Sequence, residues 1–234
     1  MCAVWDDPRV ARGVAAQLEL RRSRLAEGDR PVGWKVAVGS RQAQENLGID
    51  GPLVGFLTSR SLVESGSTFS VAGFTKPAFE AEIAVHMGAD LGAGASREET
   101  SRAIAALGPA IELVDVDRPL ADLEPVLAGD IYQRGVVLGK ADSSRAGGSG
   151  AGLGARVLCD GAEIAQTDDP AAFAGDSIES VRQVAHFLAA FGERLSAGDV
   201  IITGLVIPLV WPSAGQRYEY ELEPLGRLEV TFTG

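Results

Sequence analysis

Phe79-Glu80-Ala81-Glu82-Ile83-Ala84-Val85-His86-Met87 is the stretch around which the chain is organised. Side chains alternate between the two faces of a β-strand, so the apolar residues at the odd-numbered positions share one face. Glu80 and Glu82 share the other face, with their backbones roughly 7 Å apart. Carboxylates this close repel each other unless a cation lies between them. The stretch therefore predicts a strand and leaves two alternatives for its glutamates, which are exposure to solvent or metal binding.

Composition excludes several classes of partner. The 234 residues carry a formal net charge of -11, and 46% of them are hydrophobic, which suffices for a substantial core. Phosphates would find no cationic surface on such a chain, so we expect no nucleic-acid partner. An acidic balance suits a site for a divalent cation, although a solubilising surface produces the same balance.

The ends and the cysteines indicate the compartment. Cys2 and Cys159 form neither a disulfide framework nor a zinc site, which favours a reducing environment. Asp6 and Asp7 lie where a signal peptide needs basic and apolar residues. No apolar run approaches the roughly 18 residues that span a bilayer. We expect a cytoplasmic protein with no membrane partner.

The remaining pattern predicts many strands and about four helices. Caps and amphipathic spacing predict helices over residues 8–27, 40–47, 96–107 and 176–191. Strands are expected at 31–38, 53–57, 110–117, 135–139 and 200–204, with hairpins at 155–166 and 217–232. Strands and helices do not alternate regularly, so the fold class is α+β and not a doubly wound parallel sheet. We expect an N-terminal helical segment, 1–30, and a single catalytic domain, 31–234.

A glycine-rich loop at 143–154 contains Gly150-x-Gly152-x-x-Ala155, which matches a loose dinucleotide fingerprint. That fingerprint should open a helix, whereas here a predicted hairpin follows. We therefore reject a nucleotide site.

The two histidines offer little support for nucleophilic catalysis. No Gly-x-Ser-x-Gly elbow accompanies them. His86 lies about 13 Å along the strand from Glu82, too far to share a metal. His186 is on the outward face of its predicted helix.

Oxygen-rich and cationic residues are better candidates. Glu112 lies on an apolar strand, where burying a carboxylate is costly unless it is paired or bound to metal, and Asp115 and Asp117 follow it. Carboxylate ligands favour Mg²⁺ or Mn²⁺ over zinc. On the strand at 31–38, Val32, Trp34, Val36 and Val38 share one face and Lys35 points opposite, beside Gly33 and Ala37. These small neighbours leave room for a ligand to approach Lys35, although most strand lysines face water.

Glu80-Ala81-Glu82, followed thirty residues later by Glu112, resembles the metal triad of the fumarylacetoacetate hydrolase superfamily. Within it, the chain most resembles the branch of 2-oxopent-4-enoate hydratases and 4-oxalocrotonate decarboxylases. Further segments match in order from about residue 30 to the end: Pro31–Val36, Leu47–Pro52 with Gly55, Pro109–Glu112, Ile201–Gly204, and Ala214 through Phe232.

The resemblance implies a mixed β-roll with a few peripheral helices, and a homo-oligomer that is a dimer or larger. It also implies a metal-dependent lyase, such as a hydratase, acting in aromatic catabolism on a small 2-oxo or 2-hydroxy-alkenoic acid. The metal, Mg²⁺ or Mn²⁺, would stabilise an enolate as a Lewis acid. Alternatives are a decarboxylase, a C–C bond hydrolase of an acylpyruvate-type substrate, or a non-catalytic member that binds a metal or an acid.

The resemblance also assigns roles to residues. The metal ligands would be Glu80, Glu82 and Glu112. Lys35 would carry a proton, with a pKa lowered by burial beside the metal. The catalytic residues are thus Lys35 and Asp130, and the substrate-binding residues are Arg60, Gln133, Thr203 and Gly204.

Four departures from the branch's pattern concern the hydration machinery. Arg60 replaces an acidic residue, which leaves two alternatives, binding of a second carboxylate or an exposed surface arginine. The usual Asp-Asn-Ala-Ser reads Asp130-Ile131-Tyr132-Gln133, and Gly-His-Pro reads Gly175-Asp176-Ser177. Leu205 follows Thr203-Gly204 where a small residue is common. The resemblance therefore covers the metal triad more fully than the hydration machinery. The substrate could differ from those of the hydratases.

Overall fold

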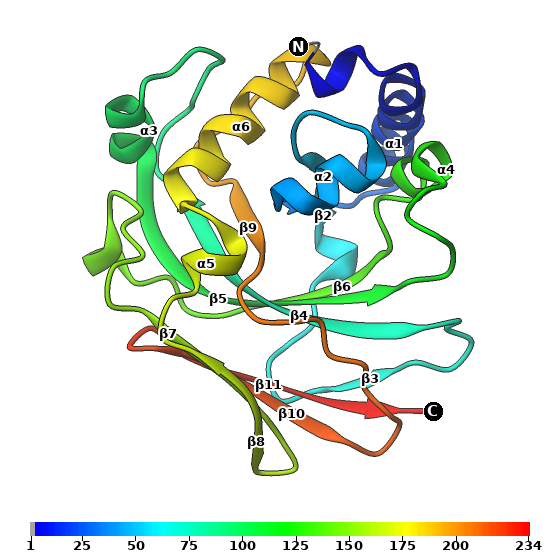
Figure 1. The fold of residues 1–234 in the computed structure, drawn as a ribbon, viewed down its shortest axis with the longest axis vertical. Helices are drawn as coiled ribbons and strands as arrows, with labels where there is room; N and C mark the ends of the chain where they lie inside the picture. Colours follow the sequence, from blue (N-terminus) through cyan, green and yellow to red (C-terminus); the bar gives the residue numbers. More distant parts are fainter. Residues whose placement is uncertain (1–2) are drawn as a thin grey trace.

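Two mixed β-sheets form the framework of the computed structural model, which describes residues 3–234 (Figure 1). The six-stranded sheet has the order β2-β1-β9-β4-β5-β6, with strands Leu53–Thr58, Pro31–Ala37, Val200–Leu205, Pro77–Met87, Ile104–Asp115 and Gln133–Leu138. The five-stranded sheet has the order β3-β11-β10-β7-β8, with strands Thr68–Ser70, Gly226–Thr233, Arg217–Glu223, Gly154–Cys159 and Ala162–Thr167. β1 pairs with β9 and β11 pairs with β3 in parallel, whereas the other pairs within the sheets are antiparallel. The α+β prediction is confirmed.

The helices lie mainly on the side of the six-stranded sheet that faces away from the five-stranded sheet (Figure 1). They are α1 Pro8–Ala26, α2 Arg41–Leu47, α3 Arg97–Ala103, α4 Leu123–Ala128, α5 Ala171–Ala174 and α6 Ser177–Ala190. Short 3-10 turns occur at Val4–Asp6, Ser59–Ser61 and Ser143–Arg145. α4 and α5 were not predicted, because six and four residues are too few to show a helical period.

Strand β4 has the predicted alternation. Phe79, Ala81, Ile83, Val85 and Met87 belong to the main hydrophobic core, while Ala84 belongs to a smaller cluster with Ala110 and Ile202 on the other face. β4 is central in its sheet, so both of its edges are hydrogen-bonded, to β9 and to β5. The two hydrophobic clusters bury residues on both of its faces.

Strand β5 begins earlier than predicted. The capping box of Ser96 and Glu99 opens α3 as expected, but the helix ends at Ala103 and not near residue 107. Ile104 and Leu107 pair with the end of β4 and are buried, so tertiary pairing overrides the local helical pattern.

Other predictions hold or stay open. Residues 154–159 form strand β7, which confirms the rejection of a dinucleotide loop, and both predicted hairpins are present. Met1 and Cys2 lie outside the described residues, and the division at residue 30 stays a prediction. No helix within residues 3–234 is long and apolar enough to cross a membrane.

Candidate metal centre

Three glutamates converge where β4 meets β5. The antiparallel register places Glu80 directly opposite Glu112, and Glu82 projects from the same face of β4. Each residue offers one carboxylate oxygen, and these oxygens lie within 4.8 Å of one another. Glu82 and Glu112 are fully buried, whereas Glu80 is partly exposed. The predicted triad is therefore brought together by strand register.

The cluster has the chemistry of a cation site. Burial and the neighbouring Glu112 raise the pKa of Glu80 to about 7, and the same two causes raise the pKa of Glu82 well above its ordinary value. Within residues 3–234, Glu82 Oε1 and Glu112 Oε2 are buried and have no hydrogen-bond partner. A hard divalent cation ligated by these oxygens would satisfy both atoms and remove the repulsion, so the residues present fit such a metal.

Lys35 is buried beside the triad. Its Nζ donates to Glu112 Oε1 and, at 2.9 Å, to the carbonyl oxygen of Ile131. Burial alone would lower the pKa of this lysine, but the attraction of Glu112, Glu80 and Asp130 outweighs it, and the pKa is raised. This direction holds for the protein without a cation, where Lys35 faces three carboxylates. The lowered pKa expected from the sequence concerns Lys35 beside a bound metal and stays a prediction.

Two glycines give Lys35 its position. A Cβ on Gly33 would lie 1.9 Å from the carbonyl oxygen of Val200, so glycine is required for β9 to approach β1. A Cβ on Gly55 would lie 2.7 Å from Cγ of Lys35. An irregularity in pairing between Pro31 and Gly33 also turns Val32 toward the smaller cluster, so it does not share the core face of Trp34 as predicted.

A strained turn supports Lys35 from the other side. Asp130, Ile131 and Tyr132 have φ values of 64°, 50° and 66°. Each such conformation costs on the order of 1–3 kcal/mol in a residue other than glycine and persists only where surrounding contacts hold it. The turn directs the Ile131 carbonyl to Lys35, and Asp130 Oδ1 accepts from the backbone N–H of Phe56 at 2.9 Å.

Asp130 is fully buried behind Lys35. Burial raises its pKa to about 7, although the positive charge of Lys35 opposes this rise. Asp130 does not line the cavity that is lined by Lys35 and Glu80. It therefore neighbours Lys35 without direct access to a ligand in that cavity.

Gly204 and Thr203 on β9 complete the site. The N–H of Gly204 donates to Glu82 Oε2 at 2.6 Å, and Thr203 Oγ1 donates to the Ile83 carbonyl at 3.3 Å. Gly204 has a φ of 94°, where pairing of β4 with β9 is irregular. Sequence reasoning missed that Gly204 orients the Glu82 carboxylate, because this contact depends on that irregular register.

Two predicted substrate-binding residues do not line the cavity. Arg60 is exposed, and its guanidinium pairs with Glu27 at 2.7 Å and with Asp29 at 3.3 Å. Gln133 is buried, and its Nε2 has no hydrogen-bond partner in the described chain. The structure thus gives neither residue a direct route to a ligand at the triad.

The other early candidates have structural roles. Asp115 accepts from the backbone N–H groups of Thr75 and Lys76 at 2.9 and 2.7 Å, which holds the turn before β4. His86 is outside the cluster, as expected, and burial lowers its pKa. His186 is only partly exposed and accepts from the N–H of Gly94 at 2.7 Å.

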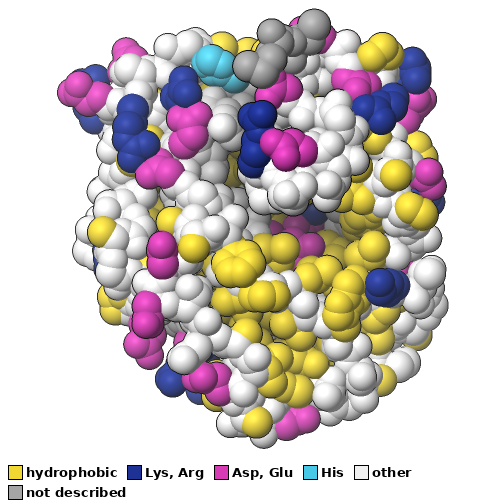
Figure 2. Space-filling model, in the orientation of Figure 1, with side chains coloured by type: hydrophobic (Ala, Val, Ile, Leu, Met, Phe, Trp, Pro, Cys, Tyr) yellow, Lys and Arg dark blue, Asp and Glu magenta, His cyan; other side chains and the backbone are white. Residues whose placement is uncertain are grey.

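A cavity of about 360 Å³ opens onto Lys35 and onto Glu80, the partly exposed member of the triad. Figure 2 shows recessed acidic side chains near the centre of this face, with hydrophobic side chains around them. The lining includes the polar residues Lys35, Glu80 and Thr203, the glycine Gly204, and the apolar residues Leu120, Phe173, Leu209 and Trp211. This apolar wall was not predicted, since its residues lie on loops or on the four-residue helix α5 and show no periodicity.

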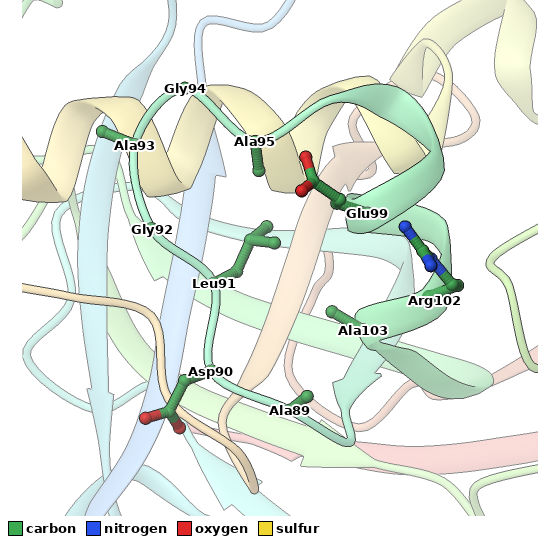
Figure 3. A pocket seen from close by; sticks show the side chains of 10 residues that line it. All are labelled: Ala89, Asp90, Leu91, Gly92, Ala93, Gly94, Ala95, Glu99, Arg102 and Ala103. Carbon is green, nitrogen blue, oxygen red and sulfur yellow. The ribbon is translucent and has the colours of Figure 1, made fainter.

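A second hollow, between β4 and α3, lacks comparable chemistry (Figure 3). Its charged residues are Asp90, Glu99 and Arg102, among glycines, alanines and Leu91. Asp90 accepts from the N–H of Ala197, and Glu99 closes the capping box of α3. Both carboxylates are therefore already used by the fold, and the triad remains the candidate site.

Comparison with known proteins agrees with this geometry. The 2-hydroxyhexa-2,4-dienoate hydratase of Comamonas testosteroni is 32% identical over 92% of this chain and 83% of its own. A 4-oxalocrotonate decarboxylase of a Pseudomonas species is 29% identical over 98% of this chain and 90% of its own. The structure of the 4-oxalocrotonate decarboxylase from Pseudomonas putida G7, complexed with magnesium and adipate, superposes with a TM-score of 0.87 at 26% identity, covering 99% of this chain and 90% of that one. The family model for the C-terminal domain of fumarylacetoacetate hydrolase matches residues 32–233, so the chain belongs to the fumarylacetoacetate hydrolase family.

Proposed function

We propose that this protein is a divalent-metal-dependent lyase that hydrates or decarboxylates a small 2-oxo or 2-hydroxy-alkenoic acid. The observation that carries the proposal is the cluster of Glu80, Glu82 and Glu112 beside Lys35 and next to a cavity. The similar hydratase and decarboxylases support the same reaction classes.

The metal we propose is Mg²⁺ or Mn²⁺, held by one oxygen from each glutamate. Three carboxylates would leave coordination positions for a ligand from the cavity side, where Glu80 is partly exposed. When bound, the cation would act as a Lewis acid toward the carboxylate and the 2-oxo group of the substrate.

Lys35 is the residue we assign to proton transfer. An ammonium group has three N–H donors, and Glu112 and the Ile131 carbonyl accept two of them. The third can donate into the cavity that Lys35 lines. From this position Lys35 would supply a proton or a positive charge to the substrate.

In this proposal Asp130 positions the ammonium group of Lys35, and Gly204 positions the carboxylate of Glu82. Asp130 lies behind Lys35 and contributes negative charge that holds the ammonium in place. Gly204 donates to Glu82 and fixes the direction of that carboxylate. Thr203 lines the cavity at the same strand end.

Turnover assays test the proposal. We expect the Mg²⁺-loaded protein to consume 2-hydroxyhexa-2,4-dienoate or 4-oxalocrotonate, with NMR separating a hydrated product from loss of carbon dioxide. Glu82→Gln should abolish turnover, whereas the exposed Glu64→Gln should leave it unchanged. If the protein bound Mg²⁺ but turned over neither compound, the lyase assignment would be wrong and a non-catalytic, acid-binding role would be favoured.

A further inference from the structure

We infer that the cavity selects 2-oxo acids with an uncharged, apolar tail and rejects those with a second carboxylate. This inference rests on the proposed function, because it assumes that the 2-oxo acid end binds at the triad. It separates the two kinds of substrate that the similar proteins use, since 4-oxalocrotonate carries two carboxylates and 2-hydroxyhexa-2,4-dienoate carries one.

Positive charge is confined to the end of the cavity near the triad. Among the described residues that line the cavity, Lys35 is the one cationic side chain. Its ammonium is already bonded to Glu112 and to the Ile131 carbonyl. A substrate oriented with its 2-oxo acid group at this end would therefore exhaust the available cationic contacts.

The remaining lining of the cavity is largely apolar. Its largest side chains are those of the apolar wall, Leu120, Phe173, Leu209 and Trp211. Tyr132 also lines the cavity, but its hydroxyl donates to the Arg118 carbonyl at 3.0 Å. A second carboxylate placed against this wall would lose its water without gaining a charged partner.

Cations outside the wall are engaged with other groups. Lys76 Nζ lies 4.0 Å from the ring centroid of Trp211, where it interacts with the aromatic face. Arg118 pairs with Asp117 at 3.0 Å, and Arg60 pairs with Glu27. None of the three lines the cavity, so a distal carboxylate has no preformed partner.

Binding measurements with unreactive acids test the selectivity. We would titrate the Mg²⁺-loaded protein by calorimetry with pyruvate, 2-oxobutanoate, 2-oxohexanoate and 2-oxohexanedioate. We expect affinity to rise from pyruvate to 2-oxohexanoate by about 10-fold or more, because the added carbons bury apolar surface. The length-matched 2-oxohexanedioate should bind at least about 100-fold more weakly than 2-oxohexanoate.

A designed charge provides the complementary test. Phe173 is 50% exposed on α5, so Phe173→Arg should fold and place a cation at the apolar wall. We expect this variant to reduce the preference for 2-oxohexanoate over 2-oxohexanedioate to about 10-fold or less. Ile164→Arg on β8, at an equally exposed position (48%), is the matched control and should retain the wild-type preference.

The outcomes separate the two proposals. If pyruvate binds but the monoacid and the diacid bind equally, the selectivity inference is wrong while the metal-dependent function stands. If the diacid binds only through Lys76, so that Lys76→Met abolishes its binding, the inference is overturned as well. If no 2-oxo acid, including pyruvate, binds the Mg²⁺-loaded protein, the proposed function fails and the selectivity inference fails with it.

Discussion

Raising the pH should destabilise the metal-free protein, and part of this loss should trace to Glu80. In the folded state, burial and the neighbouring Glu112 raise the pKa of Glu80 from 4.5 to about 7. The unfolded chain keeps the ordinary value. Between pH 4.5 and 7 the folded state therefore holds a proton that the unfolded state has released, and the free energy of unfolding falls as pH rises. Above pH 7 both states are ionised and the loss is complete.

The size of the effect follows from the difference in pKa. The change from 4.5 to about 7 is worth roughly 3 kcal/mol at 1.36 kcal/mol per pKa unit. Asp130, whose pKa burial raises from 3.8 to about 7, adds a loss of the same sign. A comparison of variants is needed to isolate Glu80.

Urea unfolding of EDTA-treated protein at pH 5 and pH 8, at constant ionic strength, measures the loss. Glu80→Gln keeps this position neutral at every pH, so the variant should lose roughly 3 kcal/mol less than the wild type between the two pH values. Glu64→Gln changes an exposed carboxylate to the same amide and should follow the wild type.

Mg²⁺ should reverse the loss at pH 8 in the wild type and in Glu64→Gln, because the cation binds the ionised, folded triad. Glu80→Gln should gain much less stability from Mg²⁺. The reasoning is refuted if Glu80→Gln loses as much stability with pH as the wild type does, or if the metal-free wild type becomes more stable between pH 5 and 8.

Three further predictions concern residues around the triad. Lys35→Met should lower kcat/KM by at least about 100-fold. Calorimetry should still detect Mg²⁺ binding, since the substitution removes a cation that competes for Glu112; loss of Mg²⁺ binding would contradict a role for Lys35 in proton transfer alone. Gly55→Ala should lower the free energy of unfolding by about 1–3 kcal/mol and reduce activity, because its Cβ would collide with Lys35; unchanged stability and activity in Gly55→Ala would show that the site is not tightly packed. Gly204→Ala should weaken Mg²⁺ binding by about 10-fold or more, because alanine is strained at a φ of 94° and the N–H donor to Glu82 would be displaced. Wild-type Mg²⁺ affinity in this variant would count against a role of Gly204 in orienting Glu82.

The strand pattern and the family resemblance together made the triad predictable. A period of two placed Glu80 and Glu82 on one face, the apolar neighbours of Glu112 indicated a second strand, and the resemblance joined the three residues. β4 and β5 form adjacent antiparallel strands, so register alone brings the three carboxylates together. Lys35 was a candidate because its small neighbours Gly33 and Ala37 leave room for a ligand. In the structure the backbone of β9, and not a ligand, occupies the space beside Gly33.

Contacts between distant segments were not predictable in the same way. The role of Gly204 depends on an irregular register between β4 and β9. The left-handed turn at 130–132 includes Ile131 and Tyr132, which are bulky residues that rarely adopt that conformation. Arg60 pairs with Glu27 at the end of α1, a partner that no local pattern indicates. The wall formed by Leu120, Phe173, Leu209 and Trp211 gathers residues from two loops and a short helix.

The most direct test of the metal centre is anomalous scattering from a crystal of this protein soaked with Mn²⁺. We predict one strong peak within coordination distance of a carboxylate oxygen from each of Glu80, Glu82 and Glu112, and no such peak in crystals of Glu82→Gln. A peak elsewhere in the molecule with the triad empty, or an unchanged peak in Glu82→Gln, would contradict the assignment of these glutamates as the metal ligands.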